Sequence, residues 1–228
     1  MKMFFGIFML ILMVPINSKA QDVNGLLDRL RIKLEKVNSY VAEGTMKTNV
    51  SFLKVPDALV KVYYQKPDHL KISNEHGISL IPRSASAISL NGLLSSKYTA
   101  IDAGTETLNG TKLRVVKLLP LDEQAEVVLS TIYIDEGRLL IIRAKTTTKD
   151  EGTYEVDMKY GKYAEFGLPD QATCSFNTKD YKLPKGVTFD YDDGSRKQAG
   201  SATKDEKGAV EISYRSYLIN EPIPKGVF

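Results

Sequence analysis

The side chains that most often carry catalysis are few in this sequence and widely spaced. The two histidines are His69 and His76. One lies in a strand-like segment and the other in or near a turn, so a zinc site would need both together with distant carboxylates. We interpret them as solvated surface residues. No G-x-S-x-G turn for a nucleophilic serine occurs, and Asp and Glu fall mainly in turns and at outward strand positions. The sequence therefore predicts a protein that is not an enzyme.

Two further features are considered as reactive or metal-binding sites. Residues 190–194 resemble part of a calcium loop, but the glycine comes too early and the terminal glutamate is missing, which favours a hairpin turn. Cys174 is the only cysteine, so no intramolecular disulfide is possible. No histidine or basic residue next to it in sequence would stabilise a thiolate, and we expect a buried structural thiol. No metal and no cofactor are expected.

Residues 1–20 have the pattern of a secretory signal peptide. Lys2 precedes a nearly unbroken apolar run, and the small residues Ser18 and Ala20 stand at the positions that favour cleavage after Ala20. The run is short for a membrane span, which needs roughly 20 residues. The residue directly after the cleavage site is Gln21 and not cysteine, so no lipid anchor is expected there. We predict a processed chain, residues 21–228, that is soluble in the periplasm and has no stable membrane span.

The processed chain has almost no net charge. Of 31 basic residues it loses Lys2 and Lys19, which leaves 29 against 28 acidic residues. No basic cluster with interleaved aromatic residues occurs, and nucleic acid is therefore not an expected partner. The length suits one large or two small domains, and no linker divides it. We expect residues 21–228 to form a single, monomeric domain.

An amphipathic helix is predicted at the start of the processed chain. Asp22 is a suitable N-cap, and charged residues cover one face of the segment that follows. Apolar residues recur at three- and four-residue spacing on the other face, so one stripe should be buried. They are Val23, Leu26, Leu27, Leu30, Leu34 and Val37.

Most of the remaining chain has strand character, with alternating apolar and polar residues and turn residues between the segments. Asn109-Gly110 is a typical hairpin turn. Residues 82–96 fit a short helix or an apolar loop equally well, and residues 195–208 read as a mobile polar hairpin loop. The predicted strands are 39–50, 60–65, 69–72, 77–81, 112–119, 127–134, 139–147, 153–160, 172–176, 186–191 and 209–218.

The predicted fold is mainly β, in the α+β class, with one curved antiparallel sheet. Residues 153–160 alternate most cleanly, which indicates a sheet with one face inside and one in water. A twisted sheet of about ten or eleven strands must curl or split. With only the N-terminal helix and a short helical segment to cover its inner face, we expect an incomplete β-barrel with these helices as a lid. Such a barrel has more interior than its own side chains fill, so an apolar cavity should remain.

The order of these elements resembles the LolA-type outer-membrane lipoprotein carriers and their LolB and RseB relatives. The resemblance rests on the signal peptide, the leading helix, Tyr64-Gln65-Lys66-Pro67-Asp68-His69-Leu70-Lys71-Ile72, and Glu106-Thr107-Leu108-Asn109-Gly110-Thr111-Lys112 before a meander. It covers nearly the whole processed chain. Two family features are absent, because Lys47, Lys54 and Lys61 stand where those carriers have an early arginine, and the chain has no tryptophan.

The resemblance implies a carrier that holds the acyl chains of a lipoprotein, or another lipid, in a half-barrel cavity. It would accept them from an inner-membrane exporter and deliver them to an outer-membrane acceptor. We expect the lid to compete with the lipid for the cavity, so that polar substitution at Leu30 or Leu34 alters lipid retention. The lid residues would be Leu26, Leu27, Leu30, Leu34 and Val37. The expected lipid-binding residues are Val60, Val62, Tyr64, Leu70, Ile72, Ile132, Ile134, Tyr154, Val156 and Met158.

Two alternatives to the carrier remain open. An RseB-like sensor or scaffold would have the same fold and would bind lipid or a segment of a membrane protein. A structural exported β-protein would have a filled core and no cavity. The 12 tyrosines also suggest stacking on sugars or bases, but they are expected to be scattered over both strand faces, as ordinary packing residues would be.

Overall fold

One antiparallel sheet forms most of the structure. The computed structural model describes residues 23–50, 56–67, 69–74, 92, 94, 96–150, 152–177 and 207–228. Within these residues ten strands follow the spatial order β3-β2-β1-β10-β9-β8-β7-β6-β5-β4, and the edge strands β3 and β4 do not pair with each other. The sheet is therefore an open, incomplete barrel, as predicted. Its strands are β1 Ser39–Asn49, β2 Ala58–Gln65, β3 His69–Asn74, β4 Tyr98–Leu108, β5 Thr111–Pro120, β6 Val127–Asp135, β7 Leu140–Thr148, β8 Thr153–Lys159, β9 Gln171–Asn177 and β10 Lys207–Ile219.

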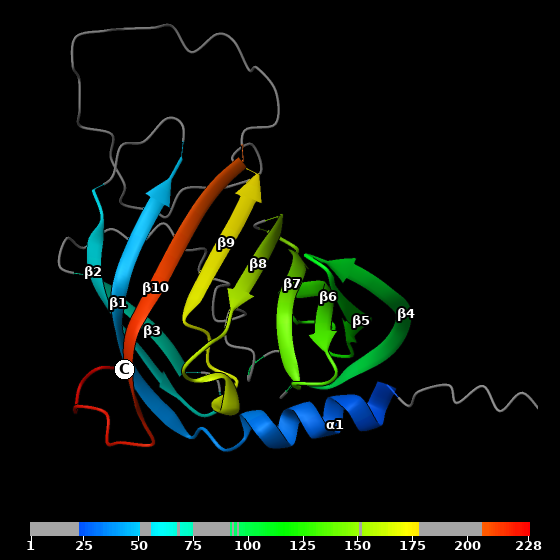
Figure 1. The fold of residues 1–228 in the computed structure, drawn as a ribbon, viewed down its shortest axis with the longest axis horizontal. Helices are drawn as coiled ribbons and strands as arrows, with labels where there is room; N and C mark the ends of the chain where they lie inside the picture. The colour runs from blue at the N-terminus through cyan, green and yellow to red at the C-terminus, as the bar shows by residue number, and fades with distance from the viewer. Residues whose placement is uncertain are drawn as a thin grey trace, which may run out of the picture.

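The first and last strands of the sheet, β1 and β10, are neighbours in the middle of the strand order. From β1 the chain runs outward through β2 to the edge strand β3, and it resumes at the opposite edge with β4. A meander then returns through β5 to β9, and β10 pairs with β1, with Tyr40 opposite Ile219. Figure 1 shows β1 and β10 side by side, with β4 at the far end of the curved sheet. The first and last strands together join the two parts of the sheet.

Helix α1, Val23–Leu34, covers one end of the concave face. It contacts β4 near its N-terminus and the short 3-10 helix η2, Ala164–Phe166, near its C-terminus, so it runs along one edge of the molecule (Figure 1). Its leucines are almost fully buried against inner residues of β5, β6 and β7. The predicted helix continues to Val37, but the observed helix ends at Leu34 and Val37 lies in the following turn. No helix of the described residues is long and apolar enough to cross a membrane.

Polar contacts tie the C-terminal end of α1 to neighbouring segments. The Arg31 guanidinium donates from Nε to the Leu94 carbonyl at 3.2 Å and from Nη2 to the Tyr98 hydroxyl at 2.9 Å. Beyond the end of the helix, the Lys66 ammonium donates to the Glu35 carbonyl at 2.7 Å. Each such bond contributes only about 1 kcal/mol. The apolar stripe therefore supplies most of the energy that holds the helix in place.

The alternation in the sequence predicts the inner face of the sheet correctly. In β2 every second side chain is buried, and in β8 Tyr154, Val156 and Met158 are buried between less buried neighbours. Asn109 and Gly110 have φ angles of 48° and 79°, as a tight hairpin turn requires, and they join β4 to β5. The expected strands 77–81 and 186–191, the polar loop before β10 and His76 lie outside the described residues. So does segment 82–96, apart from Ser96 and the helical residues Gly92 and Leu94.

The turn between β6 and β7 is stabilised by the side chain of Asp135. One carboxylate oxygen accepts the backbone N–H groups of Gly137 and Arg138, both at 3.1 Å, and the other accepts Arg138 Nε at 2.8 Å. Burial raises the pKa of Asp135, but the hydrogen bonds from Arg138 and Gly137 lower it by more, and the net pKa lies below the usual value. The charged carboxylate therefore stabilises this turn.

Candidate functional site

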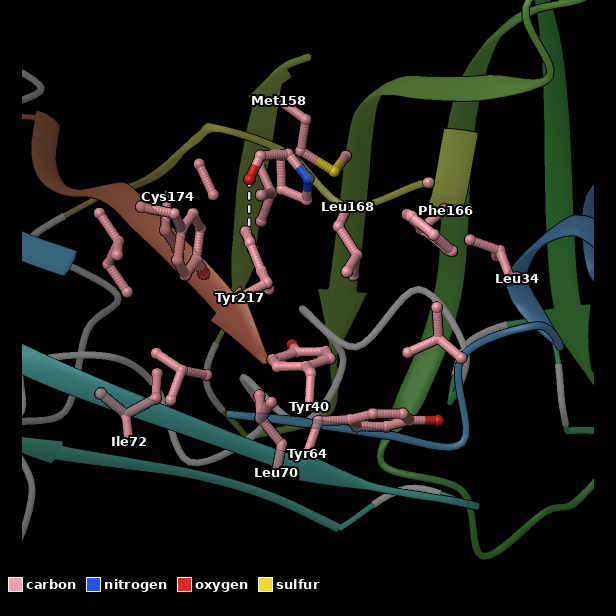
Figure 2. Close-up of a pocket in the computed structure, with 18 of the residues that line it drawn as sticks. Leu34, Tyr40, Tyr64, Leu70, Ile72, Met158, Phe166, Leu168, Cys174 and Tyr217 are labelled. Atoms are coloured by element: carbon pink, nitrogen blue, oxygen red, sulfur yellow. Dashed lines mark hydrogen bonds between the residues drawn. The ribbon is translucent and has the colours of Figure 1, made fainter. Parts of the chain in front are cut away.

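An apolar cavity lies on the inner face of the sheet, between β1–β3, β8–β10 and the segment that contains η2. Its volume, as the space open to a water-sized sphere, is about 60 Å³. Figure 2 shows Leu34 and Phe166 at one side and Tyr40, Tyr64 and Leu70 along another. The lining residues are Leu34, Val37, Tyr40, Val62, Tyr64, Leu70, Ile72, Val156, Met158, Phe166, Gly167, Leu168, Pro169, Ala172, Cys174, Val210, Ile212, Tyr214 and Tyr217.

Among the described residues, no charged side chain lines this cavity. The polar side-chain groups that the described residues contribute to it are the hydroxyls of four tyrosines and the thiol of Cys174. Burial raises the pKa of that thiol to about 12, so it stays protonated at neutral pH. Within the described part of the chain, no group of three or more His, Cys, Asp or Glu residues is placed to hold a metal ion. The lining is suited to a hydrocarbon ligand and offers no nucleophile or general base.

The cavity is small, and residues of α1 and of the segment after η2 form part of its wall. At roughly 10–15 Å³ for each water-sized sphere, about 60 Å³ holds only a few water molecules. Leu34 at the end of α1 is 5% exposed and Leu168 after η2 is 8% exposed, and both side chains form part of the wall. An acyl chain would need the lid to move. In this structure the cavity is therefore too small to hold an acyl chain.

Helix α1 and the η2 segment lie close together at Leu34 and Gly167. Gly167, the C-cap of η2, has φ 69°, a left-handed conformation that favours glycine. A Cβ atom there would lie 2.6 Å from Cδ2 of Leu34. A side chain at this position would therefore require the Leu34 side chain to move. Glycine allows both the turn and the close approach that closes the cavity.

A β-bulge directs two tyrosines of β10 into the same face. The register between β1 and β10 shifts at Glu43 and Gly44, so that Ser216 lies opposite Glu43 and Tyr214 opposite Gly44. The extra residue, Arg215, changes the alternation, and Tyr214 and Tyr217 both point inward although they are three residues apart. Glycine is needed opposite the bulge, because a Cβ at position 44 would lie 2.5 Å from the Ser213 carbonyl oxygen.

These residues complete a cluster of tyrosines, four of which line the cavity. The Tyr40 ring stacks on Tyr64 with 5.2 Å between centroids and meets Tyr217 edge-on at 5.4 Å. Tyr217 also contacts Tyr163 at 4.9 Å and Tyr214 at 5.1 Å. Scattered tyrosines were the expectation from the sequence. For these five the structure shows a cluster instead, because the bulge and the direct pairing of Tyr40 with Tyr64 bring them together.

Of the four tyrosine hydroxyls that belong to the cavity lining, two have partners and two do not. Tyr217 donates to the Pro169 carbonyl at 2.7 Å, the dashed line in Figure 2, and Tyr64 donates to the Pro67 carbonyl at 3.3 Å. Among the described residues, the Tyr40 and Tyr214 hydroxyls have no hydrogen-bond partner. Burial raises the pKa of both tyrosines above the usual value, so each keeps its proton.

The structure brings some of the expected site residues together and separates others. Val62, Tyr64, Leu70, Ile72, Val156 and Met158 line the cavity. Val60, Ile132, Ile134 and Tyr154 are buried in the main core but do not line it. Of the expected lid residues, Leu26, Leu27 and Leu30 pack in the main core, and Leu34 and Val37 reach the cavity. The wall formed by residues 166–169 was missed, because this segment has neither strand nor helix periodicity.

The curved sheet, its covering helix and the apolar interior define an open half-barrel. The same fold is found in several solved structures. A putative outer membrane lipoprotein-sorting protein domain from Vibrio parahaemolyticus matches with a TM-score of 0.56 and 9% identity, over 88% of this chain and 93% of that one. A LolA superfamily protein from Nitrosomonas europaea matches with a TM-score of 0.53 and 10% identity, over 89% of this chain and 96% of that one.

A third structure extends the same comparison. A DUF1329 family protein from Desulfovibrio piger matches with a TM-score of 0.51 and 12% identity, over 89% of this chain and 95% of that one. No protein-family model and no curated protein sequence matches the chain. At these identities the likeness is one of fold. The chain has the LolA-type fold that its order of elements predicts.

Proposed function

We propose that this protein binds the acyl chains of a lipid or lipoprotein in the apolar cavity and carries them through the periplasm. The observation that supports this most is a cavity without charged residues, closed by a helix that could be displaced. The LolA-type fold adds support, since one protein that shares it is described as a putative outer membrane lipoprotein-sorting protein domain. The partners would be an inner-membrane exporter and an outer-membrane acceptor, and the carrier would act as a monomer.

The energetics favour transfer over permanent storage. Burial of an acyl chain with roughly 15 methylenes contributes on the order of 10 kcal/mol, at about 0.8 kcal/mol for each CH₂. Without an opposing cost, release from such a site would be very slow. In this structure the ligand must displace Leu34 and the η2 segment, whose own apolar surface would then lose its site. Competition between lid and ligand reduces the net affinity and permits release.

The lid would open first at its C-terminal end. All four buried leucines of α1 belong to the larger core cluster, but only Leu34 also lines the cavity and approaches Gly167. The earlier expectation treated Leu30 and Leu34 as equivalent test positions. Because Leu30 is 1% exposed and does not line the cavity, its replacement would mainly destabilise the fold. Leu34 is therefore the position that tests the competition.

The first test is to identify what the protein holds when it is purified from an exported preparation without detergent. Organic extraction and mass spectrometry should find acylated species in near-stoichiometric amount. A variant with Ala172→Phe, which fills the cavity, should lose them. Ala144→Phe is the matched control, because Ala144 is equally buried in the sheet but does not line the cavity.

Two results would refute the carrier. A lipid-free protein that also fails to bind an apolar dye would mean that the cavity is not used and that a structural role is correct. A stable complex with a segment of a membrane protein, without turnover of lipid, would instead support the sensor role.

A further inference from the structure

The unpartnered hydroxyls of Tyr40 and Tyr214 give the apolar cavity a polar end. Both residues line the cavity, and both rings pack on Tyr217, with centroid distances of 5.4 Å and 5.1 Å. Among the described residues, no fully buried side-chain oxygen or nitrogen lacks a partner. The two hydroxyls, which have none, must therefore face open space. Two donors held by neighbouring rings are thus available to a ligand in the cavity.

We propose that Tyr40 and Tyr214 donate hydrogen bonds to the carbonyl oxygen of an ester-linked acyl chain, so that the cavity selects neutral acyl esters over free fatty acids. This inference rests on the proposed function and specifies its ligand. A hydroxyl that has left water gains a bond to a carbonyl acceptor, whereas a plain hydrocarbon leaves it unsatisfied. The Gly44 bulge is what places Tyr214 on the cavity side.

The absence of charge in the lining supports selection against free fatty acids. A fatty acid is ionised at neutral pH, and burial of its carboxylate without a positive partner is costly. Two basic residues, Arg31 and Lys66, line a separate hollow beside Leu34 and Tyr64. Both already donate to partners, Arg31 to Leu94 and Tyr98 and Lys66 to Glu35. An ester presents the same acceptor without the charge.

The test compares three ligands with the same chain, which are methyl dodecanoate, dodecanoate and dodecane. Each is measured by its ability to displace the neutral dye N-phenylnaphthylamine from the exported protein at about pH 8, where the acid is ionised. The ester should bind more tightly than either of the other two. Replacement of both Tyr40 and Tyr214 by phenylalanine should weaken the ester at least tenfold, at about fivefold for each lost bond, and should leave dodecane unchanged.

Tyr63→Phe is the matched control. Tyr63 lies on the same strand as Tyr64 but on the opposite face of the sheet, outside the cavity. The Tyr63→Phe variant should bind all three ligands with the affinities of the wild type. Equal weakening of ester and dodecane in the double variant would show that the tyrosines act only by packing, and it would overturn the inference while leaving the proposed function intact. Failure of the wild type to bind the dye or any ligand would overturn both.

The source of the ester is found with two larger probes. A diacylglyceryl-cysteine peptide represents a lipoprotein, and a diacylglycerol with the same acyl chains represents a membrane lipid. If one of the two probes displaces the dye from the wild type but not from the double variant, the result supports the inference and identifies the source of the ester. Displacement of the dye by both to the same extent in wild type and double variant contradicts it.

Discussion

Replacement of Leu34 by alanine should raise the affinity of the protein for an apolar ligand while it lowers the stability of the fold. Leu34 is 5% exposed, lines the cavity and contacts Gly167. The change removes three carbons, worth about 2 kcal/mol of burial in the closed lid. If the ligand must displace this side chain, affinity should rise by up to about thirtyfold. The free energy of unfolding should fall by about 2–4 kcal/mol, as for other buried leucines.

The assay pairs dye titration with urea denaturation. Binding of N-phenylnaphthylamine gives the affinity, and the midpoint and slope of unfolding give the stability. Leu118→Ala is the control, because Leu118 is 1% exposed in the same core but does not line the cavity. It should lose similar stability without a gain in affinity. An unchanged or lower affinity for Leu34→Ala, or an equal gain for Leu118→Ala, would refute competition between lid and ligand.

Three further predictions concern other parts of the fold. Gly44→Ala should lower the free energy of unfolding by on the order of 2 kcal/mol and weaken ester binding, because the new Cβ would lie 2.5 Å from the Ser213 carbonyl oxygen. Gly137→Ala is the control and should change the free energy of unfolding by less than about 0.5 kcal/mol. Cys174 should react slowly with a thiol reagent at about pH 8, since its pKa is raised to about 12, and fast labelling of the native protein would contradict its burial. The pKa of Asp135 is lowered in the folded protein, so the stabilisation from its carboxylate is present above about pH 4 and is lost as the pH falls through the folded pKa. The Asp135→Asn variant should therefore unfold at a lower urea concentration than the wild type at neutral pH. This difference in urea midpoint should disappear in acid.

The inner face of the sheet could be predicted from the sequence because burial there follows strict alternation. Strand β4 could not, since most of its side chains are exposed and its sequence shows no alternation. As an edge strand it is held by backbone pairing with β5 and not by an apolar face. The sequence marks only its end, at the Asn109-Gly110 turn.

The position of the cavity along that face was harder to predict than the face itself. Ile132 and Ile134 alternate as well as Val156 and Met158, and all four belong to the core that includes the α1 leucines, but only the second pair lines the cavity. Alternation shows which way a side chain points and does not show what covers it. That all four contact a bound lipid stays a prediction.

The tyrosine cluster depends on a feature that periodicity hides. Tyr214 and Tyr217 are an odd number of residues apart, so a regular strand would place them on opposite faces. The single glycine in β1, Gly44, was the available signal, because glycine within a strand often marks a bulge or a close approach of another backbone. From the sequence alone its partner strand was not known.

The pairing of β1 with β10 also has a consequence for how the chain folds. Strands β1 to β3 and β4 to β9 are joined in the sheet only through β10, which is the last strand to be synthesised. Until residues 207–219 are present, each part has an extra open edge, and the pairing must close a loop of nearly the whole chain. A chain that ends before Lys207 should therefore be degraded by protease throughout, and a protected core in it would contradict this. Such late closure leaves the sheet incomplete until β10 has been added.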